Sequence, residues 1–106
     1  MQTQQRCDLT GMVALVTGAG GGLGPFIARA LAEAGATVAV NDRTLERTTA
    51  TVEELRRAGF AVEGFPADVT DSAQVDQLVQ HVVERFGQLD ILVNKAEAHG
   101  SGRRSD

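Results

Sequence analysis

A glycine-rich turn between a strand and a helix is the feature that most limits how this chain can fold. The apolar run Val13–Val16 is typical of a buried strand and leads directly into Thr17-Gly-Ala-Gly-Gly-Gly-Leu-Gly24. Beyond the glycines, an apolar stripe recurs at helical spacing: Phe26, Ile27, Ala30, Leu31 and Ala34. Glycines let the backbone turn sharply and approach a phosphate, and the helix N-terminus offers unpaired N–H groups and its dipole. The order strand, glycine turn, helix therefore predicts a phosphate-binding element.

An acidic residue one helix later supports this interpretation. The second apolar segment, Thr37-Val-Ala-Val-Asn41, ends at Asp42, 18 positions after Gly24. A dinucleotide-binding fold places the carboxylate that hydrogen-bonds the adenosine ribose at about this distance. The alternative is that Gly20 to Gly22 form a flexible loop and that Asp42 is a turn residue ahead of a helix.

Three motifs in the same order resemble those of the short-chain dehydrogenase/reductase family. Thr17 to Gly24 matches the family's TGxxxGxG signature, Asp68-Val69 resembles its adenine-contacting motif, and Leu89-Asp-Ile-Leu-Val-Asn94 resembles the strand that leads into its NNAG motif. The match extends from about Leu9 to Asn94 and then breaks, because the chain continues Asn94-Lys-Ala-Glu97. The resemblance implies a set of cofactor-binding residues: Thr17, Gly18, Gly20, Gly21, Gly22, Leu23, Gly24, Asp42, Arg43, Asp68, Val69 and Asn94.

The implied cofactor is NAD, with NADP the less favoured alternative. Asp42 can accept hydrogen bonds from a ribose 2′-hydroxyl but would repel a 2′-phosphate. Family members that prefer NADP often carry a basic residue just before the second motif glycine, where this chain has Gly21. Arg43 follows Asp42 and offsets part of the repulsion.

The alternation of apolar segments predicts an α/β fold, a partial Rossmann fold with a doubly wound parallel sheet. The strands are expected at Val13–Thr17, Thr37–Asn41, Ala61–Phe65 and Ile91–Asn94. The helices are expected at Gly22–Ala34, at Leu45–Ala58 with Leu45, Val52 and Leu55 inward, and at Asp71–Gly87 with one apolar face of Val75, Leu78, Val79, Val82 and Phe86.

Right-handed crossovers predict the strand order 3-2-1-4 and leave this sheet incompletely covered. The first two helices lie on one face, and the third lies alone on the other. Parallel sheets are normally covered on both faces, and Ile91-Leu-Val93 is an uninterrupted apolar run. The uncovered face and the bare edge beyond Ile91–Asn94 predict self-association.

Residues for catalysis are missing from the sequence. The resembled family uses a tyrosine for proton transfer, a lysine that lowers its pKa and a serine that holds the substrate oxygen. This chain contains no tyrosine, its only lysine is Lys95, and Ser72, Ser101 and Ser105 cannot be mapped to the family's serine. His81 is expected to be a surface residue. Two histidines and the remote Cys7 form no metal-ligand pattern. We therefore predict no catalytic residue and no metal site.

Composition limits the partners and the location. The net charge is −4, and no basic cluster carries interleaved aromatic residues, which argues against nucleic acid. No apolar run approaches the roughly 20 residues that a membrane span needs, and the polar first residues show no signal-peptide pattern. A cytoplasmic location follows. Residues 1–8 are expected to form a polar leader, 9–94 an NAD(P)-binding half-domain, and 95–106 an irregular, disordered tail.

Three functions are compatible with these features. The favoured one is an N-terminal fragment of an NAD(P)-dependent oxidoreductase of the short-chain dehydrogenase/reductase type, inactive alone. Residues 95–106 have the Ala, Gly, Arg and Ser bias of an out-of-frame GC-rich stretch, so a frameshift or truncation near codon 95 is our hypothesis. The alternatives are a non-catalytic nucleotide-binding module and one half of a split reductase completed by another chain.

Overall fold

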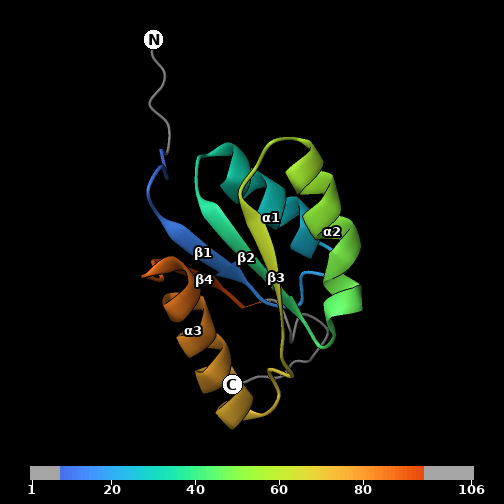
Figure 1. Cartoon of the computed structure of the whole chain (residues 1–106). Helices are drawn as coiled ribbons and strands as arrows, with labels where there is room; N and C mark the ends of the chain where they lie inside the picture. Colours follow the sequence, from blue (N-terminus) through green and yellow to red (C-terminus); the bar gives the residue numbers. More distant parts are fainter. Residues whose placement is uncertain (1–7, 95–106) are drawn as a thin grey trace, which may run out of the picture.

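Four parallel strands form one sheet with helices on both faces (Figure 1). The structure is a computed structural model that describes residues 8–94. Its strands are β1 (Val13–Val16), β2 (Thr37–Asp42), β3 (Val62–Pro66) and β4 (Ile91–Val93), and its helices are α1 (Gly24–Glu33), α2 (Leu45–Arg57) and α3 (Ser72–Phe86). The spatial order β3-β2-β1-β4 with parallel pairing throughout confirms the predicted partial Rossmann fold.

The ends of several elements differ from the sequence prediction by one or two residues. Helix α1 begins at Gly24 and not at Gly22, because Gly22 has a φ of 61°, which a right-handed helix does not accommodate. Strand β2 continues through Asp42, which pairs with Pro66 of β3. Strands β1 and β4 each end one residue earlier than expected, so Thr17 and Asn94 follow their strands.

The core lies in two layers, one on each face of the sheet. Alternate β-strand residues point to opposite faces, so Val16 and Val40 pack under α1 and α2, whereas Leu15 and Ala39 pack against α3. Figure 1 shows α1 and α2 together on one side and α3 on the other. This arrangement agrees with the one expected from right-handed crossovers.

The buried face of α1 agrees with the predicted stripe only in part: Ile27 and Leu31 pack against the core as predicted, but other members do not. Phe26 is 72 % exposed and Ala30 is also exposed, while Ala28 and Ala32 are buried. The helix approaches the sheet through Gly24, Ala28 and Ala32, which are spaced four residues apart and carry small side chains. Apolar residues lie on both faces of α1, so periodicity alone does not distinguish the buried face; at Gly24 the approach is so close that a Cβ would lie 2.6 Å from the Cα of Ala19.

The other helical faces follow the prediction more closely. In α2, Val52 and Leu55 are buried as expected, but Leu45 is 55 % exposed because it is the first residue of the helix. In α3, Leu78 and Val82 are buried, as predicted. Asp71 caps α3 by accepting a hydrogen bond from the N–H of Ala73, and Gly87 ends it with a φ of 88°.

The α3 face of the sheet is covered only in part. Strand β4 pairs with β1 and with no further strand among residues 8–94, and Leu92 is 55 % exposed. A hollow beside α3 is lined by Leu15, Thr17, Val69, Val75, Leu78, Val79, Leu92 and Asn94. The open edge and face expected from the sequence are therefore present in the described part of the chain.

Two predicted segments lie outside the described residues: the leader, apart from Asp8, and the tail 95–106 with Lys95. None of the helices in residues 8–94 has the length and apolar character needed to cross a membrane.

Candidate functional site

The glycine turn leads into a helix whose N-terminus has no side-chain cap. Leu23 is the N-cap residue of α1, its side chain makes no capping hydrogen bond, and Pro25 falls in the first turn. By contrast, Thr44 caps α2 and Asp71 caps α3 through side-chain oxygens. The first turn of α1 carries no acidic residue. The Gly24 N–H donates to the Gly21 carbonyl oxygen at 3.2 Å and Pro25 has no N–H, so the first turn offers an external anion the Phe26 N–H and the helix dipole.

The glycines of the turn are required for two different reasons. Gly18 and Gly22 have φ values of 63° and 61°, a conformation that other residues rarely adopt. A Cβ on Gly20 would lie 2.5 Å from the Arg47 carbonyl oxygen, and one on Gly24 would lie 2.6 Å from the Cα of Ala19. Gly21 has no atom within 4 Å of such a Cβ. Sequence reasoning singled out Gly18 and Gly22 and missed the packing role of Gly20 and Gly24.

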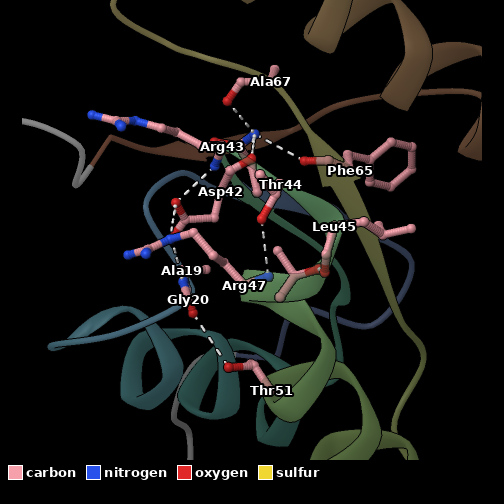
Figure 2. Close-up of polar contacts among 12 residues, drawn as sticks. Ala19, Gly20, Asp42, Arg43, Thr44, Leu45, Arg47, Thr51, Phe65 and Ala67 are labelled. Carbon is pink, nitrogen blue, oxygen red and sulfur yellow. Dashed lines mark hydrogen bonds and ion pairs between the residues drawn. The ribbon is translucent and has the colours of Figure 1, made fainter.

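Hydrogen bonds tie the centre of the turn to β2 and α2. The N–H of Ala19 donates to the carbonyl oxygen of Asn41 at 2.7 Å. The carbonyl oxygen of Ala19 accepts from the Thr51 hydroxyl at 3.3 Å (Figure 2). Since both polar groups of Ala19 are satisfied internally, the turn is held in one conformation from two sides.

Asp42 lies at the end of β2, beside this turn. Its Oδ2 accepts from the Gly20 N–H at 2.9 Å, and its Oδ1 accepts from the Arg43 N–H at 2.7 Å and the Arg47 Nε–H at 2.9 Å (Figure 2). Burial raises the pKa of this carboxyl, but the two N–H groups and the Arg47 guanidinium together lower the pKa below its ordinary value. Asp42 is therefore a carboxylate at neutral pH, and it joins the glycine turn to α2.

Asn41 is a further organising residue that sequence reasoning did not identify. It is 1 % exposed, and its Nδ2 donates to the carbonyl oxygens of Phe65 at 2.9 Å and Ala67 at 3.3 Å. These bonds hold the segment after β3 against the end of β2. That segment leads into Asp68 and Val69, so Asn41 positions the second predicted motif.

Asp68 and Val69 have different surroundings. The Asp68 carboxylate accepts from the Thr70 hydroxyl at 2.6 Å and the Thr70 N–H at 3.0 Å, which lower its pKa. The positive charge of Arg43 also lowers the pKa of Asp68. Val69 is half-buried and lines the hollow beside α3.

Thr17 and Asn94 meet at the carboxyl ends of β1 and β4. The Thr17 hydroxyl donates to the Asn94 Oδ1 at 3.0 Å, and the Thr17 N–H donates to the Val93 carbonyl oxygen at 2.9 Å. The glycine turn, Asp42, Asp68 and Asn94 all follow the C-terminal ends of parallel strands, so they share one edge of the sheet. Ligands of open α/β sheets bind at this edge, where the strand order reverses.

Comparison with known proteins identifies the family. The sequence profile described as short chain dehydrogenase matches residues 12–106, which is most of the chain. The chain belongs to the short-chain dehydrogenase family. Its sequence is 48 % identical over 94 residues to a Streptomyces violaceoruber protein assigned as ketoacyl reductase 1 of the granaticin polyketide synthase. It is 41 % identical over 88 residues to the 2,3-dihydro-2,3-dihydroxybenzoate dehydrogenase of Bacillus subtilis. These matches cover 89 % and 83 % of this chain.

Solved structures of this family share the fold. A hydroxysteroid dehydrogenase from Escherichia coli superposes with a TM-score of 0.78 at 34 % identity, covering 82 % of this chain and 37 % of that protein. A metagenomic short-chain oxidoreductase in complex with NADP gives a TM-score of 0.75 at 36 % identity, covering 79 % of this chain and 38 % of that protein. The chain spans about a third of the length of the curated relatives, 35 % and 34 % for the two named above.

The family binds NAD or NADP. In this chain the same edge of the sheet carries the N-terminus of α1 and the Asp42 carboxylate at the end of β2. Within residues 8–94, no three His, Cys, Asp or Glu side chains are grouped closely enough to hold a metal ion. His81 is exposed on α3, as predicted.

Proposed function

We propose that residues 9–94 form the dinucleotide-binding half-domain of an NAD(P)-dependent oxidoreductase. The observation that carries this proposal is the uncapped N-terminus of α1, which follows a turn with two left-handed glycines. The Gly20 N–H of that turn donates to the Asp42 carboxylate. The pyrophosphate would bind at Gly18 to Gly24, where Gly21 leaves open space and α1 supplies its dipole and the Phe26 N–H. Asp42 and Arg43 would lie at the adenosine ribose, and Asp68, Val69, Thr17 and Asn94 along the rest of the edge.

Of the two dinucleotides, NAD is the proposed cofactor. Asp42 is ionised at neutral pH, so it accepts hydrogen bonds from ribose hydroxyls and repels a 2′-phosphate. Calorimetric titration with NAD and NADP tests this preference. Tighter binding of NADP would contradict it.

Substitution of Gly22 tests whether the turn holds the phosphates. Gly22→Val is expected to abolish dinucleotide binding, because a branched side chain in the left-handed region distorts the turn. Gly59→Val is the matched control, since Gly59 also has a positive φ and open space around it but lies at the far end of α2. Both variants carry a similar folding penalty, which circular dichroism measures. Binding lost in both variants, or retained in Gly22→Val, would contradict the proposed phosphate site.

We further propose that this chain carries no hydride-transfer chemistry by itself. A bound nicotinamide supplies the hydride, but a proton-transfer group with a pKa near the working pH is also needed. The sequence contains no tyrosine, its only lysine, Lys95, lies outside the described residues, and Ser72 is the exposed first residue of α3. The substrate of a complete protein would be bound by residues outside this chain.

The open sheet edge supports a second proposal, self-association. Leu92 on β4 is more than half exposed beside the hollow lined by Leu15 and Val69. Burying such apolar surface against a second copy would stabilise a dimer. Light scattering after size exclusion tests this, with Leu92→Lys expected to dissociate the assembly. Val83→Lys, a similar change at an exposed position of α3, is the control.

The two alternatives from the sequence predict different observations. A split reductase requires a second polypeptide that co-purifies with this chain and restores activity. A non-catalytic module requires that this chain bind a dinucleotide without a second polypeptide and without catalytic activity. A cytoplasmic location stays a prediction.

A further inference from the structure

The carboxylate that would receive the ribose is already engaged by the protein. A carboxylate oxygen has two lone pairs. Oδ1 of Asp42 accepts two hydrogen bonds, from the Arg43 N–H and the Arg47 Nε–H, and Oδ2 accepts one, from the Gly20 N–H. The side chain of Asp42 is only 11 % exposed. One acceptor position on Oδ2 therefore remains for an external ligand.

One remaining acceptor position is too few for a bidentate contact between Asp42 and the ribose. The 2′- and 3′-hydroxyls of an adenosine ribose are adjacent donors, and a bidentate contact requires an acceptor position on each oxygen. Of the three internal donors, the two backbone N–H groups are fixed by the fold. Arg47 is the mobile one, because its side chain is 59 % exposed and its ion pair with Asp42 spans 2.9 Å at the surface. A bidentate ribose contact thus requires Arg47 to leave Oδ1.

The main chain holds Arg47 within reach of Asp42. Arg47 lies in the first turn of α2, where its N–H donates to the Thr44 side chain that caps the helix. Its carbonyl oxygen packs so close to Gly20 that a Cβ there would lie 2.5 Å away. These contacts keep the start of α2 against the glycine turn, with the Arg47 Nε–H on Asp42.

We infer that Arg47 is a specificity-determining residue: it competes with the ribose hydroxyls for Asp42, and its charge offsets the repulsion of a 2′-phosphate by that carboxylate. This inference rests on the proposed dinucleotide binding. Arg47 weakens binding of NAD and strengthens binding of NADP, so it narrows the preference that Asp42 alone would set. Arg43 follows Asp42 at the end of β2 and is exposed, so its charge adds to the attraction for the phosphate.

Arg47→Gln in the full chain tests the inference, with Arg57→Gln as the matched control. Arg57 lies on the same helix at its opposite end, so the control removes the same charge away from the turn. Calorimetry measures binding of NAD and NADP, and of the shorter probes AMP and adenosine 2′,5′-bisphosphate. Arg47→Gln is expected to tighten NAD and AMP about two- to fivefold, the range of a partly exposed ion pair, and to weaken the 2′-phosphorylated ligands by at least as much. Arg57→Gln is expected to change neither group of ligands.

Different results would contradict the role of Arg47 and the proposed dinucleotide binding. If the wild-type chain binds these ligands and Arg47→Gln leaves the ratio of NAD to NADP affinity unchanged, the inference is wrong and the proposed function stands. A loss of affinity for both ligand groups to the same extent would assign Arg47 a purely structural role and also overturn the inference. If the folded wild-type chain binds none of the four ligands, the proposed function fails and the inference fails with it.

Discussion

The substitution Gly24→Ala separates two opposing effects at the start of α1. Alanine favours a helix over glycine by up to about 1 kcal/mol, so propensity alone predicts a stabilised protein. The structure predicts the reverse. The new Cβ would lie 2.6 Å from the Cα of Ala19 and 2.7 Å from the carbonyl oxygen of Gly18. Both contacts are with backbone atoms, which cannot rotate away as a side chain would.

The size of the effect follows from these contacts. Overpacking by one methyl group costs about 1–3 kcal/mol, and the propensity gain offsets at most about 1 kcal/mol of it. Since both contacts at Gly24 are with backbone atoms, the cost falls in the upper part of this range, about 2–3 kcal/mol, and we expect Gly24→Ala to lower the free energy of unfolding by about 1–2 kcal/mol. A change of 1 kcal/mol shifts the Tm of a domain of this size by roughly 4–8 °C, which thermal unfolding followed by circular dichroism resolves easily.

Gly21→Ala is the control within the same turn. Gly21 is exposed, has no atom within 4 Å of the position that a new methyl group would take, and does not have a positive φ. The Tm of this variant should stay close to that of the wild type, within the equivalent of about 0.5 kcal/mol. A Gly24→Ala protein with a Tm equal to or above the wild-type value would refute the packing described for this turn.

Three further predictions concern the same region. Asp42→Asn should destabilise the fold at neutral pH by about 1–3 kcal/mol, because three donors lose an ionised acceptor. Since the folded pKa of Asp42 is lowered, this stabilisation is present above the unfolded pKa of about 3.9 and is lost as pH falls through the folded value. The wild-type and variant unfolding energies should therefore converge in acid, and a gap that stays constant down to full protonation would contradict this account. Thr51→Val should cost about 1 kcal/mol by leaving the Ala19 carbonyl without its donor, whereas Thr49→Val, exposed on the same helix, should cost less; equal effects would show that the Thr51 contact contributes nothing. The purified chain should show no dehydrogenase or reductase turnover with any alcohol or carbonyl substrate, and NADH consumption that tracks protein concentration and disappears in Gly18→Val would disprove this.

The sequence by itself determined the order of elements and the place of the glycine turn. Strand and helix periods are local properties, and the alternation of the two with right-handed crossovers leaves few topologies. The order β3-β2-β1-β4 and the solitary α3 followed from these rules and agree with the structure. The motifs at Thr17–Gly24, Asp68-Val69 and Leu89–Asn94 also indicated the family, because each motif is a short stretch of sequence.

Tertiary structure decided which residues are in contact across the fold. The exclusion of a Cβ at Gly20 depends on the carbonyl of Arg47, which lies one strand and one helix further along the chain. Phe26 and Ala28 are both apolar, yet Ala28 is buried and Phe26 is 72 % exposed, because the orientation of α1 on the sheet decides which of its apolar residues are covered. The ion pair between Arg47 and Asp42 likewise depends on how α2 packs against the glycine turn. Side-chain contacts between distant segments produce no periodic pattern in a single sequence, so the sequence alone does not predict this pair.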